Sequence, residues 1–489
     1  MSINALKKAA QFAFADGGSI KARVLRSGLW VGLSEIGLQA LSLIRSVVLA
    51  RLLTPEAFGV MGLAMIVVRA VETFTRPGVA QALIARQQSF EEAASTAYTM
   101  LVARGFILAA LLAALAPLVG RFYESSQLVS ALQALCLLFV VGGFANINTI
   151  ARQRELDFRR LTYLAQTTTL TGTLITIGVA YWVRSVWALV IGQLATVSLN
   201  TLLSYVFLPG RPRLAFDRAV ARDLLAYGKF ITGSSIILYI ATELDTAVVG
   251  KVLGPEQVGF YTLAFMLTHL VTANLAKIAS SVMMPAYAKL QTDRPALRHA
   301  FLRTMSLVLT VVTPITVGLI ALADPLIEVV YGEKWVPAVI PLQLLAVFGW
   351  FRSVAAFNGY LFEGMGKPGI AFRLGVIRLA LIAPAMVPAT YAWGLAGAGA
   401  TVIVGIAAQW VGGLFYLRSE LDIRPGEVLR LMARPWLTSL VMGLAAAAVV
   451  AAWPDYSVIS VGAAVLCGML VYAVLNLRSL IQLARERVH

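Results

Sequence analysis

The sequence predicts an all-α integral membrane protein with about fourteen transmembrane helices. Hydrophobic residues make up 59% of the 489-residue chain and charged residues only 13%, whereas soluble domains average about 45 to 50% and about 25%. Apolar stretches of about 20 residues recur from Leu29 to Leu475, and each is long enough to cross about 30 Å of hydrocarbon. The sequence left outside these stretches is too short for a soluble catalytic domain.

Short polar segments separate the apolar stretches and set the expected order of the spans. We expect the spans to begin near residues 28, 57, 95, 127, 161, 186, 229, 257, 304, 338, 374, 395, 436 and 457. The segment 1–27 is basic and lacks a short apolar core followed by a small-residue cleavage site. We therefore expect an uncleaved cytoplasmic N-terminal segment before the first span.

Basic residues are distributed unevenly between the two alternating sets of connections. If both termini are cytoplasmic, most of the 40 Lys and Arg fall in inside segments. The outside loops then hold only Arg51, Arg121, Arg184, Lys251 and Lys334. This asymmetry follows the rule that basic residues resist translocation. It also explains the net charge of +16 through topology, so no nucleic acid is expected as a partner.

One turn occurs twice in the chain, in register with its flanking helices. Leu53-Thr54-Pro55-Glu56 with Gly59 matches Leu253-Gly254-Pro255-Glu256 with Gly259, which indicates an internal repeat. An even number of spans separates the copies, so the repeats are parallel. We expect two six-helix lobes plus two C-terminal helices. The boundaries are 28–209 for the N-lobe, 210–228 for a cytoplasmic linker, 229–417 for the C-lobe, and 418–489 for two further spans and a cytoplasmic C-terminus.

Three motifs resemble one known family. They are the two copies of this turn, the stretch from Asp324-Pro325-Leu326-Ile327 to Tyr331-Gly332-Glu333-Lys334-Trp335, and Gly364-Met365-Gly366-Lys367-Pro368. They resemble the Wzx-type polysaccharide and O-antigen flippases of the multidrug/oligosaccharidyl-lipid/polysaccharide exporter superfamily, over about Arg26 to Arg418. The resemblance implies a MATE-like fold with the substrate site between two lobes that rock to alternate access.

The resemblance also implies a function. Such proteins flip an undecaprenyl-pyrophosphate-linked oligosaccharide from the cytoplasmic to the periplasmic leaflet of the bacterial inner membrane, for exopolysaccharide or lipopolysaccharide assembly. The implied partners are this lipid-linked sugar, membrane lipids, H⁺ or Na⁺, and the polymerase and chain-length proteins of polysaccharide assembly. The sequence has no phosphate loop, metalloprotease motif or serine-hydrolase motif. We therefore expect no enzyme activity, cofactor or metal.

Charged residues inside the predicted spans are the candidate substrate contacts, because an arginine at mid-bilayer costs at least ~2.5 to 3.5 kcal/mol. Arginines hold diphosphate oxygens through paired, charge-assisted hydrogen bonds. We expect such a cradle from Arg45, Arg69, Arg76 and Arg352. Arg69, Glu72 and Arg76 share one helix face, and the other expected cavity residues are Glu35 and Gln39 beside Arg45.

Two alternatives stay open for these basic residues. Arg69 and Arg76 could simply pair with Glu72. Arg104, Arg378 and Lys277 could extend along their alkyl stems to the cytoplasmic interface.

Three titratable residues in the seventh and eighth spans are candidates for ion coupling. Asp245, Glu243 and His269 lie in apolar surroundings, where a carboxyl group can exchange a proton or bind sodium. The alternative is that Asp245 neutralises Arg45 or reaches the outer surface near Lys251, and that the histidine is a wall residue.

Two other functions compete with flipping. An ion-coupled multidrug or metabolite exporter of the same fold would favour acidic cavity residues over a row of arginines. A polysaccharide polymerase or ligase would need a long periplasmic loop, but the longest expected outside loop, around Asp324 to Pro337, is short. We also expect Gly394, Gly397, Gly399 and Gly405 to serve close helix packing.

Overall fold

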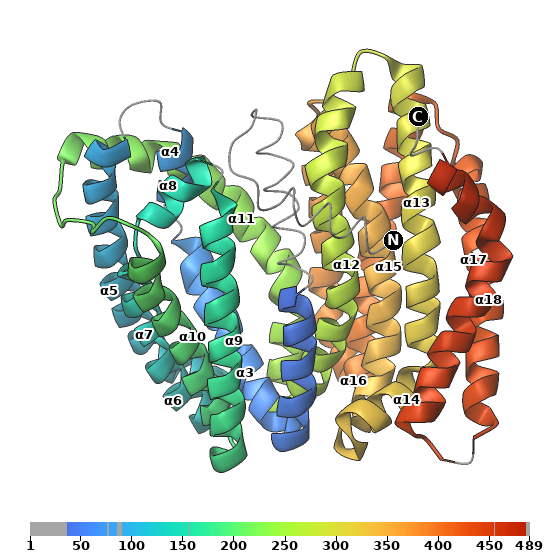
Figure 1. Cartoon of the computed structure of the whole chain (residues 1–489), viewed down its shortest axis with the longest axis horizontal. Helices are drawn as coiled ribbons and strands as arrows, with labels where there is room; N and C mark the ends of the chain where they lie inside the picture. Colours follow the sequence, from blue (N-terminus) through green and yellow to red (C-terminus); the bar gives the residue numbers. More distant parts are fainter. Residues whose placement is uncertain (1–36, 76–77, 86–89, 156, 454, 486–489) are drawn as a thin grey trace, which may run out of the picture. The chain divides into compact units, whose positions relative to one another are not determined.

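The computed structural model describes residues 37–75, 78–85, 90–155, 157–453 and 455–485, and throughout this part of the chain the regular elements are helices (Figure 1). The chain divides into two compact units, the first ending at Ile240 and the second beginning at Ala241. Helix α11 (Arg218–Leu253) contains this boundary. The predicted all-α class is confirmed.

The first unit starts with a helical stretch at residues 37–52. Helix α9 packs along α10, α10 also contacts α3 and α7, and α5 contacts α6 and α7. The bounds are α3 Pro55–Phe74, α4 Val79–Ala85, α5 Phe90–Phe122, α6 Ser126–Leu135, α7 Leu137–Gly143, α8 Asn148–Arg154, α9 Phe158–Val183 and α10 Val186–Phe207.

In the second unit, α15 is the central helix, because it packs against α12, α13 and α16. Helix α13 also contacts α17, and α17 contacts α18. The bounds are α12 Pro255–Leu290, α13 Arg294–Ala321, α14 Ala323–Leu326, the π-helical turn η1 Ile327–Tyr331, the 3₁₀ helix η2 Glu333–Ala338, α15 Val339–Gly364, α16 Pro368–Leu421, α17 Pro425–Ala451 and α18 Val458–Arg485.

Most helices correspond to predicted spans, although α11, α13 and α17 begin at Arg218, Arg294 and Pro425, before the predicted starts near residues 229, 304 and 436. The predicted start near residue 28 lies outside the described residues. Nine segments of the described chain are long and apolar enough to cross a membrane. Helix α9 has 26 residues, which is also enough to cross, but it is too polar to belong to that set. Helices α11 and α12 have 36 residues each and contain residues whose placement is not described. Polar spans of this kind are expected where a helix faces protein or a watery cavity instead of lipid.

Two predicted spans are joined without a loop in α16. The helix is interrupted only at Gly394, whose φ of 58° and ψ of −138° are not helical. Beyond this point the chain folds back, since Gly405 lies against Ile382 and Gly412 against Leu374. The two arms are therefore antiparallel. A Cβ atom on Gly397 would lie 1.9 Å from the carbonyl oxygen of Ala389. The predicted role in close packing is confirmed for Gly397, Gly399 and Gly405, whereas a Cβ on Gly394 would meet nothing within 4 Å.

The variant Gly397→Ala is expected to lower the amount of folded protein in the membrane. The added methyl group has to push two backbones apart, and overpacking of this kind costs about 1 to 3 kcal/mol. The matched control is Gly375→Ala in the first arm of α16, where a Cβ meets nothing within 4 Å. Membrane abundance and the thermal midpoint of the detergent-purified protein should fall only for the first variant. Equal values for the two variants would contradict the tight packing.

The repeated turn has the same place in both units. Thr54 precedes α3, its Oγ1 accepts a hydrogen bond from the amide of Ala57 at 3.3 Å, and Pro55 begins the helix. In the second copy Gly254 precedes α12 with a φ of 86°, and Pro255 begins the helix. Proline suits the first helical position because its missing amide hydrogen has no partner there. The repeat predicted from the sequence therefore has a structural counterpart.

The connection between α10 and α11 is not helical over residues 208–217. Asn146 Nδ2 donates to the carbonyl oxygens of Leu208 and Gly210 at 3.4 and 3.2 Å. Asp217 ends the connection, and its Oδ1 accepts from the amides of Ala219 and Val220 at 2.7 and 3.1 Å. The first part of the predicted linker is therefore a bound, extended segment, and its second part is the start of α11.

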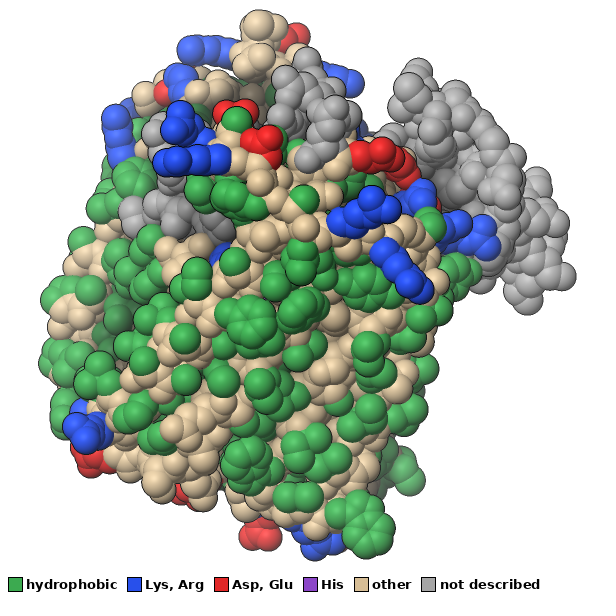
Figure 2. Space-filling model, turned by 90° about the vertical axis from the view of Figure 1, so that its left-hand side faces the viewer, with side chains coloured by type: hydrophobic (Ala, Val, Ile, Leu, Met, Phe, Trp, Pro, Cys, Tyr) green, Lys and Arg blue, Asp and Glu red, His purple; other side chains and the backbone are tan. Residues whose placement is uncertain are grey.

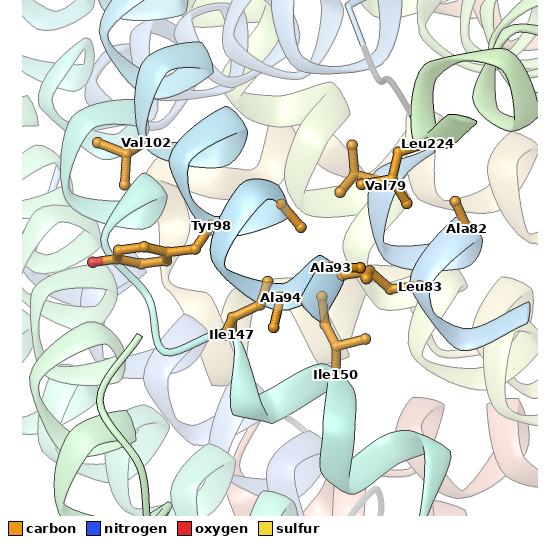
Figure 3. Close-up of a cluster of buried hydrophobic side chains, with 11 residues drawn as sticks. Val79, Ala82, Leu83, Ala93, Ala94, Tyr98, Val102, Ile147, Ile150 and Leu224 are labelled. Atoms are coloured by element: carbon orange, nitrogen blue, oxygen red, sulfur yellow. The ribbon is translucent and has the colours of Figure 1, made fainter. Parts of the chain in front are cut away.

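Buried contacts near this connection join several helices of the first unit (Figure 3). Leu83 of α4, Ala94 and Tyr98 of α5, Ile150 of α8 and Leu224 of α11 are all within one buried apolar cluster. Elsewhere, large apolar side chains remain exposed on the helices, for example Trp182 and Leu444. On the face seen in Figure 2, hydrophobic side chains cover a broad middle band and charged side chains gather toward its ends. Lipid contact explains such exposure.

Candidate functional site

In the first unit, the candidate cavity residues differ in burial. Arg45 is half-buried and makes no hydrogen bond or ion pair with any described residue. Gln39 is half-buried on the same helical stretch. Arg69 and Glu72 are exposed on α3, and Glu35 and Arg76 lie outside the residues whose placement is described. Among the described candidate arginines of the first unit, Arg45 is therefore the half-buried one.

Two side chains from other helices donate hydrogen bonds to backbone carbonyl oxygens in α3 and at its end. Arg104 of α5 donates from Nη2 to the carbonyl oxygen of Glu72 at 2.9 Å and from Nε to that of Thr75 at 3.3 Å. The Tyr239 hydroxyl of α11 donates to the carbonyl oxygen of Ile66. The Arg104 guanidinium therefore satisfies backbone oxygens that a helix end leaves without partners.

In the second unit, Asp245 is only 5% exposed. Its Oδ2 accepts a hydrogen bond from the Tyr261 hydroxyl at 2.8 Å, and its Oδ1 accepts from the amide of Thr246 at 2.8 Å. The alternative that Asp245 reaches the outer surface near Lys251 is wrong, because the carboxylate is buried between α11 and α12. Tyr261 itself is fully buried.

Two arginines share the electrostatic surroundings of this carboxylate. Arg378 of α16 donates from Nη2 to the carbonyl oxygen of Ala241, one helical turn before Asp245, at 3.3 Å. Its guanidinium lies over the ring of Phe348, 5.5 Å from the centroid. Arg352 of α15 interacts electrostatically with both Asp245 and Arg378. The expectation that Arg378 extends to the interface is therefore wrong.

A series of aromatic rings connects His269 to this group. The His269 ring stacks on Phe265 with centroids 5.9 Å apart, and Phe265 lies 6.4 Å from Phe348. Two of the three candidate coupling residues, Asp245 and His269, thus lie on one connected set of side chains. Glu243 is half-buried two residues before Asp245. No group of three or more His, Cys, Asp or Glu among the described residues could hold a metal ion.

Several buried polar atoms on α15 and α16 have no hydrogen-bond partner among the described residues. They include Nε of Arg378, both amide atoms of Asn358, Oε1 of Gln409 and Nε1 of Trp410. A Cβ atom on Gly405 would lie 3.4 Å from Cγ of Arg378, and one on Gly413 would lie 2.6 Å from Nδ2 of Asn358. Gln409 lies midway between these glycines on the same helix face. Unsatisfied buried polar atoms are rare and often mark a place for water or a ligand.

Sequence reasoning missed Tyr261 and the position of Arg378. The signal for Arg378 was a charge within an apolar stretch, but its neighbour Asp245 lies on another helix far away in the chain. For Tyr261 a signal existed in the repeat, because this tyrosine takes the position of Met61 in the first copy.

Comparison with known proteins shows the family to which the chain belongs. The family described as "Polysaccharide biosynthesis protein" matches residues 48–340. The chain belongs to this family. One relative, the lipopolysaccharide biosynthesis protein WzxC of Escherichia coli (strain K12), is 28% identical over 373 residues, which are 76% of this chain and 75% of WzxC. Another, the teichuronic acid biosynthesis protein TuaB of Bacillus subtilis (strain 168), is 24% identical over 459 residues, 92% of this chain and 95% of TuaB.

Solved structures show the fold that this polysaccharide biosynthesis family member shares with transporters. The lipid II flippase MurJ in its inward closed conformation matches with a TM-score of 0.77 and 15% identity, over 93% of this chain and 99% of MurJ. An inward-facing multidrug resistance transporter of the MATE family matches with a TM-score of 0.62 and 16% identity, over 85% and 97%. The Wzx-type resemblance and the MATE-like fold are confirmed, and the chain is a multi-pass membrane protein related to transporters instead of enzymes.

Proposed function

We propose that this protein is a flippase that moves an undecaprenyl-pyrophosphate-linked oligosaccharide from the cytoplasmic to the periplasmic leaflet of a bacterial inner membrane. The observation that carries the proposal is the excess of positive charge within its spans. Arg45, Arg352 and Arg378 are half-buried there, and Asp245 is the buried carboxylate beside two of them. Such charge is costly in a membrane unless it meets an anion or water.

A diphosphate between lipid and sugar suits these arginines. Guanidinium groups form paired hydrogen bonds with phosphate oxygens, and their attraction strengthens where water is excluded. An exporter of cationic drugs would gain nothing from this arrangement. The family membership supports the same conclusion, because the relatives named above serve polysaccharide biosynthesis. We also propose that the substrate cavity includes Glu35, Gln39, Arg69, Glu72 and Arg76.

The proposed orientation has both termini in the cytoplasm. The distribution of basic residues along the chain supports it. Figure 2 agrees, since Lys and Arg gather at one end of the apolar band more than at the other on the face that it shows. Alternating access in the two-unit transporter fold would then carry the sugar from that end to the opposite one.

Coupling through Asp245, Glu243 and His269 is proposed for H⁺ in preference to Na⁺. The Asp245 carboxylate already accepts hydrogen bonds from Tyr261 and Thr246, and no group of three or more His, Cys, Asp or Glu among the described residues could complete a coordination shell around a metal ion there. A proton needs no coordination shell, so it remains compatible with this environment. Flipping in proteoliposomes should respond to an imposed pH gradient and not to a sodium gradient. Flipping that is independent of both gradients would remove the coupling role.

The variant Arg45→Gln is expected to lower flipping at least about tenfold, because a charge-assisted contact to phosphate contributes about 1.5 to 3 kcal/mol. The measurement is the leaflet that holds the lipid-linked oligosaccharide, scored with surface polymer in a strain that depends on this protein. Arg121→Gln, at the exposed end of α5, is the matched control and should behave as wild type. If depletion of the whole protein leaves intermediates and polymer unchanged, export of a drug or metabolite becomes the better hypothesis.

A further inference from the structure

The second unit contains two positive charges and one negative charge in close electrostatic contact. Arg352 and Arg378 each interact with Asp245, and they also repel each other. We call Arg352, Arg378, Asp245 and Tyr261 the arginine cluster. Phe348 and Arg352 lie one turn apart on α15, and the guanidinium of Arg378 covers Phe348. The arginine cluster therefore combines side chains from α11, α12, α15 and α16 within the second unit.

The carboxylate of the cluster does not form an ion pair with either arginine. Among the described residues, Asp245 accepts hydrogen bonds only from the Tyr261 hydroxyl and from Thr246, and no nitrogen of Arg352 or Arg378 lies within 4.0 Å of it. Tyr261 is fully buried, so its hydroxyl is fixed in this position. The tyrosine thus holds the negative charge near the arginines but apart from them.

The arginines consequently keep hydrogen-bond donors for another partner. Arg378 uses Nη2 on the carbonyl oxygen of Ala241, whereas its buried Nε has no acceptor in the described part of the chain. Arg352 makes no hydrogen bond to any described residue. A guanidinium group has five donors in a planar fork that matches phosphate oxygens. The cluster therefore combines a net positive charge with donors that lack acceptors.

We propose that Arg352 and Arg378 form a diphosphate-binding site within the second unit, and that Asp245, held by Tyr261, is its resident counterion. The proposal rests on the proposed function and names the residues that would hold the diphosphate of the lipid-linked sugar. Asp245 repels the diphosphate and so weakens its binding, which keeps release rapid. Tyr261 is a positioning residue, since it prevents the carboxylate from closing onto the arginines when the site is empty.

The test is binding of inorganic pyrophosphate to the purified full-length protein in nanodiscs, measured by calorimetry. Arg378→Gln should weaken binding about tenfold or more, because a charge-assisted contact is lost. Asp245→Asn should tighten binding, since it removes the repulsion and keeps the shape. Arg373→Gln, an exposed arginine on the same helix, should leave the affinity unchanged. Weaker binding for both Arg378→Gln and Asp245→Asn, or no change for Arg378→Gln, would overturn the proposal.

A separate pair of variants tests the positioning role of Tyr261. Tyr261→Phe should weaken pyrophosphate binding although it removes no charge, because the freed carboxylate can pair with an arginine. The double variant Asp245→Asn with Tyr261→Phe should bind as tightly as Asp245→Asn alone. A merely structural tyrosine would instead weaken binding equally in both backgrounds, and that result would refute the positioning role.

Two further experiments distinguish a lipid-linked diphosphate from a soluble one, and distinguish failure of the proposed binding site from failure of the proposed function. Undecaprenyl pyrophosphate incorporated in the nanodisc should displace inorganic pyrophosphate; failure to displace it would assign the site to a soluble diphosphate and overturn the proposal. Wild-type protein that binds pyrophosphate as described but does not flip lipid in proteoliposomes would refute the proposed function alone. Flipping with a pyrophosphate affinity insensitive to Arg378→Gln would refute the site alone.

Discussion

Replacing Arg352 and Arg378 together by glutamine is expected to abolish surface polymer. Both side chains interact electrostatically with Asp245, and their loss leaves this cluster with a net negative charge where the substrate diphosphate would lie. Loss of two charge-assisted contacts is worth about 3 to 6 kcal/mol, or a decrease of at least about a hundredfold in the rate of flipping. Polymer output and the cytoplasmic-leaflet pool of lipid-linked oligosaccharide measure this directly.

A third substitution separates function from folding in this experiment. Without its arginines, the buried Asp245 loses favourable interactions, and an uncompensated buried charge can destabilise by about 3 to 5 kcal/mol. Adding Asp245→Asn makes the cluster neutral, so the triple variant should reach the membrane at normal abundance and still make no polymer. Normal polymer from the triple variant would show that neither arginine is needed for transport.

Trp335→Ala is expected to cause the largest loss of stability of any single substitution suggested by this structure. The indole of Trp335 is fully buried and meets Phe260 edge to face, with centroids 6.0 Å apart. Truncation of a buried tryptophan costs about 3 to 5 kcal/mol, because the surroundings collapse only partly into the cavity. The thermal midpoint of the detergent-purified protein and its membrane abundance should both fall.

The matched control is Trp182→Ala, because this tryptophan at the end of α9 is 84% exposed. Its removal leaves no internal cavity, so the thermal midpoint should hardly change. A comparable decrease in the thermal midpoint for both variants would mean that the burial of Trp335 does not account for its contribution to stability.

Most of the helical framework could be predicted because the membrane imposes one simple rule, namely long apolar stretches separated by short polar ones. The start of α3 and of α12 was predicted well, since Pro55 and Pro255 are strong local signals. The position of the reversal in α16 was also predicted, since a new span was expected near residue 395 and the helix is interrupted at Gly394. The absence of a loop between these two spans was not predicted, because apolarity alone does not show how short a connection is.

Candidate site residues were predictable only as charges in an apolar setting. That signal selected Arg45 and Arg352, which are half-buried, and Asp245, which is buried. It could not assign partners, because Tyr261 and Arg378 reach Asp245 from other helices. The partners of Arg104 were missed for the same reason, since the carbonyl oxygens that it binds belong to another helix. Contacts between distant segments depend on how helices pack, and this packing cannot be deduced from a single sequence.

The loop-free reversal at Gly394 bears on how this protein can be studied and how it can vary. Because Gly397, Gly405 and Gly412 each contact a matching residue of the first arm, an inserted residue would shift every pair along α16 out of alignment. Changes of length should therefore be tolerated far less here than changes of side chain. An epitope or reporter inserted at Gly394 would disrupt the packing of α16. Single cysteines placed on the flanking helical turns would instead show which side of the membrane the reversal faces.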